Sequence, residues 1–286
     1  MNFGFIGLGQ MGGGLSKNLI RAGKEVKLFD LNPEAIKKVL AAGTTGIKAN
    51  SADELADVDV LFTSLPLPKH LEQMMLGEKG LINKMKKGAT YIEVSTIDPQ
   101  TARKLSDACT AKGIGYLQCP LGLTPAQAEQ GKEPIYVGGK KEVYENMKEV
   151  LAIVGGNVTY LGEVEASAAF KIISNMIGMT NLAVLSEGFR IGEKAGIDRT
   201  LLLDLLAETG AFSFQMKVRG PWIVNHDFAN RFGLDLALKD VRLGIEMADA
   251  WENDAKAMRV CLEYLKEASG NGYGKEDCDA MYKVIK

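Results

Sequence analysis

The segment GFIGLGQMG, residues 4–12, constrains the fold more than any other part of the chain. It places Gly7, Gly9 and Gly12 in a G-x-G-x-x-G pattern between a buried-strand pattern and a helical one. Here the first glycine permits a tight turn, the second lets the backbone approach a pyrophosphate, and the third lets helix and strand pack closely. The helix N-terminus then offers unpaired N–H groups to the phosphates. The segment therefore predicts a dinucleotide-binding turn.

An acidic residue at the end of the next predicted strand, EVKLFD, fits this turn. Asp30 follows Gly12 at the spacing of the acid that binds a ribose 2′-hydroxyl and repels a 2′-phosphate. No arginine follows Asp30, which favours NAD over NADP, although Lys37 and Lys38 would soften this preference if they reach the ribose. Further cofactor contacts are expected from Leu8, Gln10, Met11, Leu31 and Asn32.

Strand and helix patterns alternate through residues 1–162, which predicts a parallel sheet covered by helices. Asn32 is expected to cap a helix that begins with Pro33, and another helix is expected after Asp98, with Pro99 inside its start. From residue 163 the patterns are helical to the C-terminus, and the first helix is expected to run from 163 to 194. We therefore expect an α/β Rossmann domain in residues 1–162 and an all-α domain in residues 163–286, joined by a long interdomain helix. The expected strands are NFGFIG, EVKLFD, VDVLFTSL, ATYIEVS, IGYLQC, EPIYVGG and NVTYLG.

Composition excludes several classes of function. The net charge is −2 and no Lys/Arg-rich run occurs, so no nucleic-acid partner is expected. The four cysteines form no CxxC pair and only two histidines are present, so neither a disulfide framework nor a metal site is expected. The apolar stretch 166–185 contains Lys171, Asn175 and Asn181, which favours a buried helix over a membrane span. The N-terminus has a strand pattern instead of a signal peptide, and we expect a cytoplasmic protein.

Four further segments carry a family resemblance: TSLP (63–66), VSTIDP (94–99), FKIISN (170–175) and FANRFGLDLALKD (228–240). With GFIGLGQMGGGLSKNL at the N-terminus, they resemble the β-hydroxyacid dehydrogenase family in order and spacing along the whole chain. The resemblance implies hydride transfer between a nicotinamide cofactor and a small β-hydroxy acid or semialdehyde. It also implies a helical domain that builds homodimers or homotetramers.

The resemblance also implies roles for individual residues. Lys171 matches the catalytic lysine of the family, and Asn175, one turn later, matches the asparagine that helps hold the substrate. The cofactor contacts implied in addition are Leu65, Pro66, Thr96 and Lys239. The substrate contacts implied are Ser95, Thr96, Gly122, Leu123, Thr124, Phe232 and Asp240.

Chemistry supports the pairing of Lys171 with Asn175, because residues four apart share one face of a helix. When hydride reaches a carbonyl carbon, an ammonium group stabilises the charge that builds on the oxygen and delivers the proton. In the oxidative direction a neutral lysine, whose pKa burial lowers, takes the hydroxyl proton. The structural alternative is that Lys171 extends to solvent from an apolar helix and Asn175 pairs with a neighbouring helix.

Three other functions share this fold. A non-catalytic NAD-binding scaffold protein and an imine reductase are alternatives in which the lysine is generally lost, so the presence of Lys171 favours the dehydrogenase. A decarboxylating 6-phosphogluconate dehydrogenase also has a lysine–asparagine pair, but its usual form is far longer than this chain.

The turn PLGLTPAQAEQG, residues 120–131, follows a predicted strand, where α/β proteins bind ligands. Most family members read proline–valine–serine–glycine–glycine here, whereas this chain has Gly122, Leu123 and Thr124 at the last three positions. The turn is closer to the glycine–arginine–threonine loop of sulfolactaldehyde reductases, with Leu123 in place of the arginine that would grip a sulfonate. We expect the amides near Gly122 and the Thr124 hydroxyl to bind the acid group of a small anionic substrate.

Overall fold

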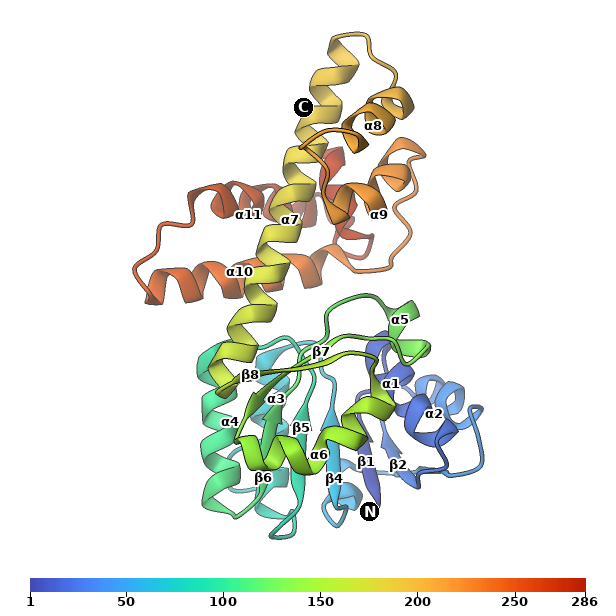
Figure 1. Cartoon of the computed structure of the whole chain (residues 1–286), viewed down its shortest axis with the longest axis vertical. Coiled ribbons are helices and arrows are strands. Elements are labelled where there is room, and N and C mark those ends of the chain that lie inside the picture. The colour runs from blue at the N-terminus through green and yellow to red at the C-terminus, as the bar shows by residue number, and fades with distance from the viewer. The chain divides into compact units, whose positions relative to one another are not determined.

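An eight-stranded sheet forms the centre of the first part of the chain, with strand order β3-β2-β1-β4-β5-β6-β7-β8 (Figure 1). The structure is a computed structural model and describes all 286 residues. Neighbouring strands are parallel except for β6 and β7, which pair antiparallel. The α/β prediction is confirmed, but the short strand β3 and the antiparallel pair were not predicted. The strands are β1 Phe3–Ile6, β2 Val26–Phe29, β3 Gly46–Lys48, β4 Val60–Thr63, β5 Thr90–Glu93, β6 Gly115–Gln118, β7 Ile135–Gly139 and β8 Val158–Gly162.

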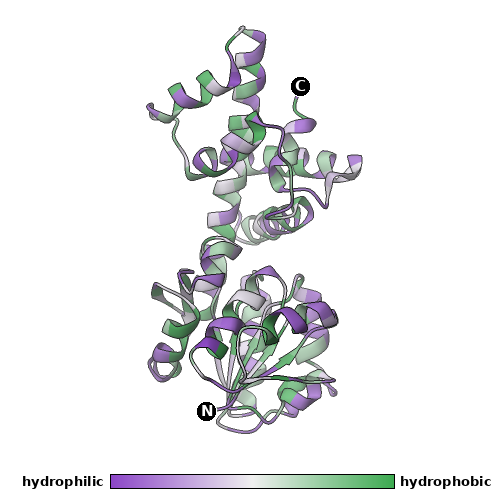
Figure 2. Cartoon of the chain, turned by 90° about the vertical axis from the view of Figure 1, so that its right-hand side faces the viewer, coloured by the Kyte–Doolittle hydropathy of each residue, from purple (hydrophilic) through white to green (hydrophobic).

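Helices cover both faces of this sheet. Successive strand residues point to opposite faces, and both faces of strands such as β1 and β4 carry buried apolar side chains. Phe5 and Phe62 join the core formed with α1, α2 and α6, whereas Ile6 and Leu61 join the core formed with α3 and α4. Figure 2 shows apolar residues along the strands and mixed polarity along the surrounding helices. The helices are α1 Gln10–Arg21, α2 Pro33–Leu40, α3 Pro68–Met75, α4 Pro99–Ala111, α5 Pro125–Glu129 and α6 Lys141–Val154, with 3-10 turns at Ala52–Leu55 and Leu81–Asn83.

The predicted cap at Asn32 is present, and the structure shows a second cap at Asp98. The side chains of Asn32 and Asp98 each accept a backbone N–H in the first turn of α2 and α4, respectively. Both helices begin with proline, whose missing N–H would have no partner inside the helix. The caps fix the chain at the points where it leaves β2 and β5, at the carboxyl edge of the sheet.

The chain divides into two compact units, Met1–Lys171 and Ile172–Lys286, and α7 (Val164–Lys194) contributes to both. The predicted helix over residues 163–194 is therefore confirmed as α7. The second unit is helical, as predicted. Its other helices are α8 Arg199–Ala207, α9 Phe214–Val224, α10 Leu234–Ala250 and α11 Lys256–Ala268, followed by turns of helix at Ser269–Tyr273 and Cys278–Lys283.

Helix α7 is long and apolar enough to cross a membrane by length and composition, with a mean hydropathy of 1.4 over its most apolar 18 residues. The core helix of a soluble protein passes the same test, and 44% of this window is buried within the structure. Leu182 and Phe189 on α7 are fully buried. Met176 lies so close to α10 that a Cβ added at Gly244 would be 2.0 Å from its sulfur. This packing supports the core-helix interpretation.

Candidate active site

The glycine turn between β1 and α1 has the backbone geometry that its pattern predicts. Gly7 has φ +86°, a left-handed conformation that favours glycine. A Cβ at Gly12 would lie 2.1 Å from the carbonyl oxygen of Gly7, so helix and strand approach too closely for any side chain. Helix α1 starts at Gln10 with neither a side-chain cap nor an acidic residue in its first turn. Its N-terminal amides therefore suit a pyrophosphate.

Asp30, directly after β2, is tied to this turn by two hydrogen bonds. Its Oδ2 accepts the backbone N–H of Leu8 at 2.6 Å, and its Oδ1 accepts that of Asn32 at 2.7 Å. The structure thus brings the residues expected around the turn, 7–12, together with residues 30–32. Leu31 is 92% exposed beside them.

A buried acid connects the loops after β4 and β5, which hold four more of the expected residues. Glu93 is fully buried, and its Oε1 accepts the N–H of Ser95 at 2.6 Å. The Ser95 hydroxyl in turn accepts the N–H of Leu65 at 2.7 Å. The other Glu93 oxygen accepts hydrogen bonds from Tyr91, at 2.6 Å, and from Thr63. Burial raises the pKa of Glu93.

Glu93 was not identified from the sequence, although an acid inside the apolar strand ATYIEVS was the available signal. Through Ser95 it fixes the position of the loop that contains Leu65 and Pro66, and it is the last residue of β5, just before the loop that contains Ser95 and Thr96. Loops at this edge of an α/β sheet are where ligands bind.

The loop after β6 uses its polar groups internally. The Gly122 amide donates to the Pro134 carbonyl at 3.0 Å, and the Leu123 amide donates to Glu133 Oε1 at 2.5 Å. The Thr124 hydroxyl bonds to the Gln127 side chain. All three donors expected to meet an acid group on the substrate therefore already have acceptors within the protein.

Glu133, between α5 and β7, is the second buried acid that the sequence did not single out. Its side chain is fully buried, and its Oε2 has no hydrogen-bond partner. Burial raises the pKa of this carboxyl, while the Leu123 amide, the Lys171 charge and the Gly122 amide act in the opposite direction. The Lys171 ammonium is therefore close enough to this loop to act on its carboxylate.

Helix α10 places three expected residues together with α7 in the second unit. Asn175 Nδ2 donates to Asp240 Oδ2 at 2.6 Å, and Lys239 Nζ lies 2.8 Å from Asp240 Oδ1. Lys239 and Asp240 are buried, with 7% and 2% of their surfaces exposed. Asn175 does pair with a neighbouring helix, and the partner is itself an expected site residue. Lys171 precedes Asn175 by one turn on the same face of α7.

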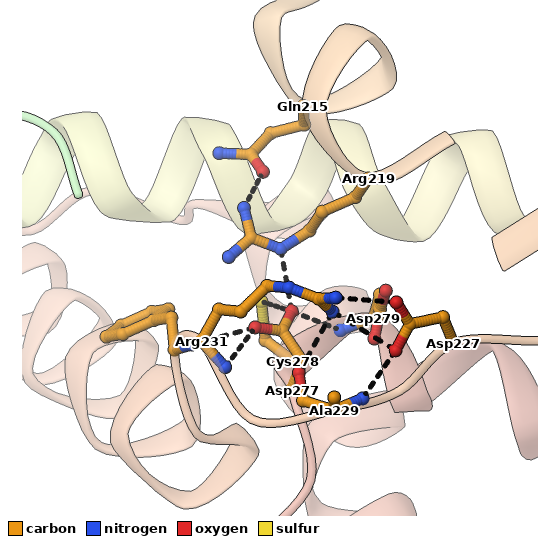
Figure 3. Close-up of polar contacts among 9 residues, drawn as sticks. Gln215, Arg219, Asp227, Ala229, Arg231, Asp277, Cys278 and Asp279 are labelled. Carbon is orange, nitrogen blue, oxygen red and sulfur yellow. Dashed lines mark hydrogen bonds and ion pairs between the residues drawn. The ribbon is translucent and has the colours of Figure 1, made fainter. Parts of the chain in front are cut away.

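The last expected residue, Phe232, is held by a cluster near the C-terminus (Figure 3). Asp277 Oδ2 accepts the N–H groups of Phe232 at 2.7 Å and Arg231 at 3.1 Å, while Oδ1 accepts Arg219 Nε at 2.8 Å. Figure 3 shows Arg219 joined to Gln215 and Asp277, and the Arg231 guanidinium joined to Asp227. This cluster fixes the chain just before α10.

Asp279 is the most perturbed acid of that cluster. It is fully buried and neither carboxylate oxygen has a hydrogen-bond partner. Burial, and then the charge of Asp277, raise its pKa to about 7, although Arg219 and Arg231 act against this. None of these C-terminal acids was singled out from the sequence.

Comparison with known proteins decides which family this is. Residues 2–162 match the family described as the NAD binding domain of 6-phosphogluconate dehydrogenase. Residues 166–285 match the family described as NAD-binding of NADP-dependent 3-hydroxyisobutyrate dehydrogenase. The 2-(hydroxymethyl)glutarate dehydrogenase of Eubacterium barkeri is 30% identical over 285 residues, covering 99% of this chain and 94% of that protein. The chain belongs to the β-hydroxyacid dehydrogenase family.

Two further relatives agree with membership of the family. The 3-hydroxyisobutyrate dehydrogenase of Pseudomonas aeruginosa is 31% identical over 254 residues, covering 86% of this chain and 85% of that protein. The crystal structure of 3-hydroxyisobutyrate dehydrogenase from Salmonella typhimurium has a TM-score of 0.89 at 29% identity and covers 99% of both chains. The predicted family, fold class and enzyme class are confirmed. The protein is an NAD(P)-dependent oxidoreductase acting on CH–OH groups of small hydroxy acids.

Proposed function

We propose that Lys171 is the general acid/base of this oxidoreductase. The observation that carries the proposal is that α7 places Lys171 one turn before Asn175 on the same face, and that Asn175 is held by Asp240. A nicotinamide cofactor supplies or accepts the hydride. As negative charge builds on the carbonyl oxygen, the Lys171 ammonium stabilises it and gives up a proton. In oxidation, neutral Lys171 accepts the hydroxyl proton.

Asn175 is proposed to orient the substrate. Its Nδ2 is committed to Asp240, which fixes the amide and leaves Oδ1 to accept a hydrogen bond. Asp240 is held in turn by the buried Lys239. The Asn175 side chain therefore has one defined orientation before substrate arrives, and preorganisation of this kind favours the productive geometry.

For the cofactor we propose NAD in preference to NADP. Asp30 accepts two backbone N–H groups at the end of β2, so its carboxylate is fixed beside the glycine turn. A fixed carboxylate at this position binds a ribose 2′-hydroxyl and repels a 2′-phosphate. The substrate proposed is a small anionic β-hydroxy acid or its semialdehyde.

We propose that the protein forms a homodimer or homotetramer through α7. Ile173, Ile177, Val184 and Ile191 are exposed by 42%, 47%, 61% and 69%. Their spacing of four, seven and seven residues places all four on one narrow stripe of the helix. A second copy covering this stripe would remove it from water. All four cysteines are free and buried, which supports a reducing, cytoplasmic location.

The experiment is NADH oxidation against succinic semialdehyde, methylmalonate semialdehyde, tartronate semialdehyde, glyoxylate and sulfolactaldehyde, repeated with NADPH. Lys171→Ala should lose roughly a hundredfold or more in kcat while NADH binding, measured by fluorescence, is retained. Lys194→Ala, at the exposed end of the same helix, is the matched control and should be unaffected. Intact turnover in Lys171→Ala would contradict the proposed role. NADH binding without turnover of any substrate would favour the non-catalytic scaffold.

A further inference from the structure

A fully buried carboxylate stands in the loop after β6, within the electrostatic reach of Lys171. Glu133 Oε1 accepts the Leu123 amide, whereas Oε2 is buried without a hydrogen-bond partner. An acceptor left unpaired away from water is costly, so buried polar atoms of this kind normally meet a donor. Oε2 therefore marks a position where a hydrogen-bond donor would be stabilised.

In the same loop, the donors that were expected to bind an acid group of a substrate are already paired. The amides of Gly122 and Leu123 and the hydroxyl of Thr124 all have internal acceptors. A substrate carboxylate arriving here would meet the negative charge of Glu133 instead of the unpaired donors that the sequence pattern predicts. Like charges brought together in a buried site destabilise each other strongly.

We propose that Glu133 determines substrate class by accepting a hydrogen bond, at Oε2, from a hydroxyl or ammonium substituent of the β-hydroxy acid. The preferred substrate then carries such a donor in addition to its reacting hydroxyl and its acid group. A methyl substituent leaves Oε2 unsatisfied, and a second carboxylate is repelled. This inference rests on the proposed function, in which Lys171 and the loop after β6 serve one substrate.

A series of acids that differ in one substituent tests this directly. The compounds HO–CH₂–CH(X)–COO⁻ with X as H, CH₃, OH, NH₃⁺ or COO⁻ are 3-hydroxypropanoate, 3-hydroxyisobutyrate, glycerate, serine and hydroxymethylmalonate. Both enantiomers are used where X makes the centre chiral. With NAD⁺, the wild-type kcat/KM should be highest for OH and NH₃⁺, roughly tenfold or more above CH₃ and H, and lowest for COO⁻.

Two variants of Glu133 distinguish a role in substrate selection from a role in holding the loop after β6. Glu133→Gln keeps an acceptor for the Leu123 amide but removes the charge, and Glu133→Leu removes both. The preference for NH₃⁺ over CH₃ should fall roughly tenfold in Glu133→Gln and be lost in Glu133→Leu, in which the freed Leu123 amide should improve the COO⁻ compound. Glu145→Gln, which neutralises a half-exposed acid on α6, is the matched control and should leave the order unchanged.

Binding measured without turnover keeps this test independent of the catalytic proposal. The thermal stabilisation that each compound gives to the NAD⁺-bound protein should follow the same order. If no compound is oxidised but the order of stabilisation depends on Glu133, the role of Lys171 fails and that of Glu133 stands. If Glu133→Gln and Glu133→Leu weaken all five compounds equally, or if the wild type prefers CH₃ or COO⁻, the inference is overturned.

Discussion

Replacing Asp279 by asparagine should stabilise the second unit at neutral and alkaline pH. In the folded protein the pKa of Asp279 is raised from 3.8 to about 7, chiefly by burial. The folded state therefore binds this proton more tightly than the unfolded state. Its contribution to the free energy of unfolding is greatest below pH 3.8, falls as the pH rises from 3.8 to about 7, and then levels off.

The magnitude follows from the two pKa values. At about 1.4 kcal/mol per pH unit, the ionised carboxylate costs the folded state about 4 kcal/mol above pH 7. About 2 kcal/mol of this cost accrues between pH 5.5 and pH 8. Asparagine has nearly the shape of the protonated acid and never ionises, so Asp279→Asn should raise the free energy of unfolding by about 4 kcal/mol at pH 8 and by about 2 kcal/mol at pH 5.5.

Urea unfolding followed by tryptophan fluorescence is the appropriate assay. The chain's two tryptophans, Trp222 and Trp251, both lie in the second unit, and the Trp222 ring lies 4.0 Å from the Arg231 guanidinium. The control is Asp254→Asn, an exposed acid of the same unit, which should change neither curve. The reasoning is refuted if Asp279→Asn destabilises the protein equally at both pH values, or if the pH dependence of the wild type persists in the variant.

Three further substitutions follow from buried contacts. Gly122→Ser would bring a Cβ to 2.9 Å from the Tyr136 ring, so it should cost about 1–3 kcal/mol in a thermal unfolding measurement, and a Tyr136→Leu background should relieve that cost. Glu93→Gln places an amide N–H₂ where the hydroxyls of Tyr91 and Thr63 now donate, and should weaken NADH binding, measured by fluorescence titration, by roughly tenfold. An unchanged dissociation constant would show that the loops after β4 and β5 keep their positions without the Glu93 carboxylate. Asp240→Ala deprives the buried Lys239 ammonium of its carboxylate and should cost about 3–5 kcal/mol in urea unfolding; a loss below about 1 kcal/mol would mean that the pair is not essential.

Most of the fold could be predicted because its helices and strands are long enough to show a hydrophobic periodicity or a helix-capping residue. The glycine turn, the capped helices α2 and α4 and the apolar helix α7 all carry local signals of this kind. Strand β3 has three residues at the sheet edge, and α5 has five, too few for either period to be recognised. The antiparallel pairing of β6 with β7 depends on their connection, which is a loop with a short helix and not a crossover over the sheet.

The candidate site was predictable only in part. Its expected ligand contacts were recognised from sequence motifs. The buried acids that hold these segments in place, Glu93 and Glu133, depend on contacts that the sequence does not display. Tyr91 and Ser95 each lie two residues from Glu93 in the sequence, but Thr63 reaches it only through the pairing of β4 with β5. Glu133 lies in a stretch that reads as a polar turn, and its burial follows from how residues 120–134 fold back on themselves. Charged residues are mostly exposed, so sequence alone gives each of these acids a surface interpretation.

The same kind of hydrogen bond occurs at three of the predicted ligand-binding segments: a carboxylate that lies outside the segment accepts its backbone N–H groups. Asp30 holds the glycine turn, Glu133 holds the loop after β6, and Asp277 holds the segment before α10. Backbone N–H groups are present whatever the side chain, so the segment keeps its place when its side chains change. Leu123 can therefore differ from the family pattern without moving the loop. In the loop after β6, the Leu123 amide donates to Glu133 where it was expected to bind the acid group of a substrate. Glu133 would then be one of the groups that the substrate meets. We therefore expect substrate class in this protein to depend more on Glu133 than on Leu123.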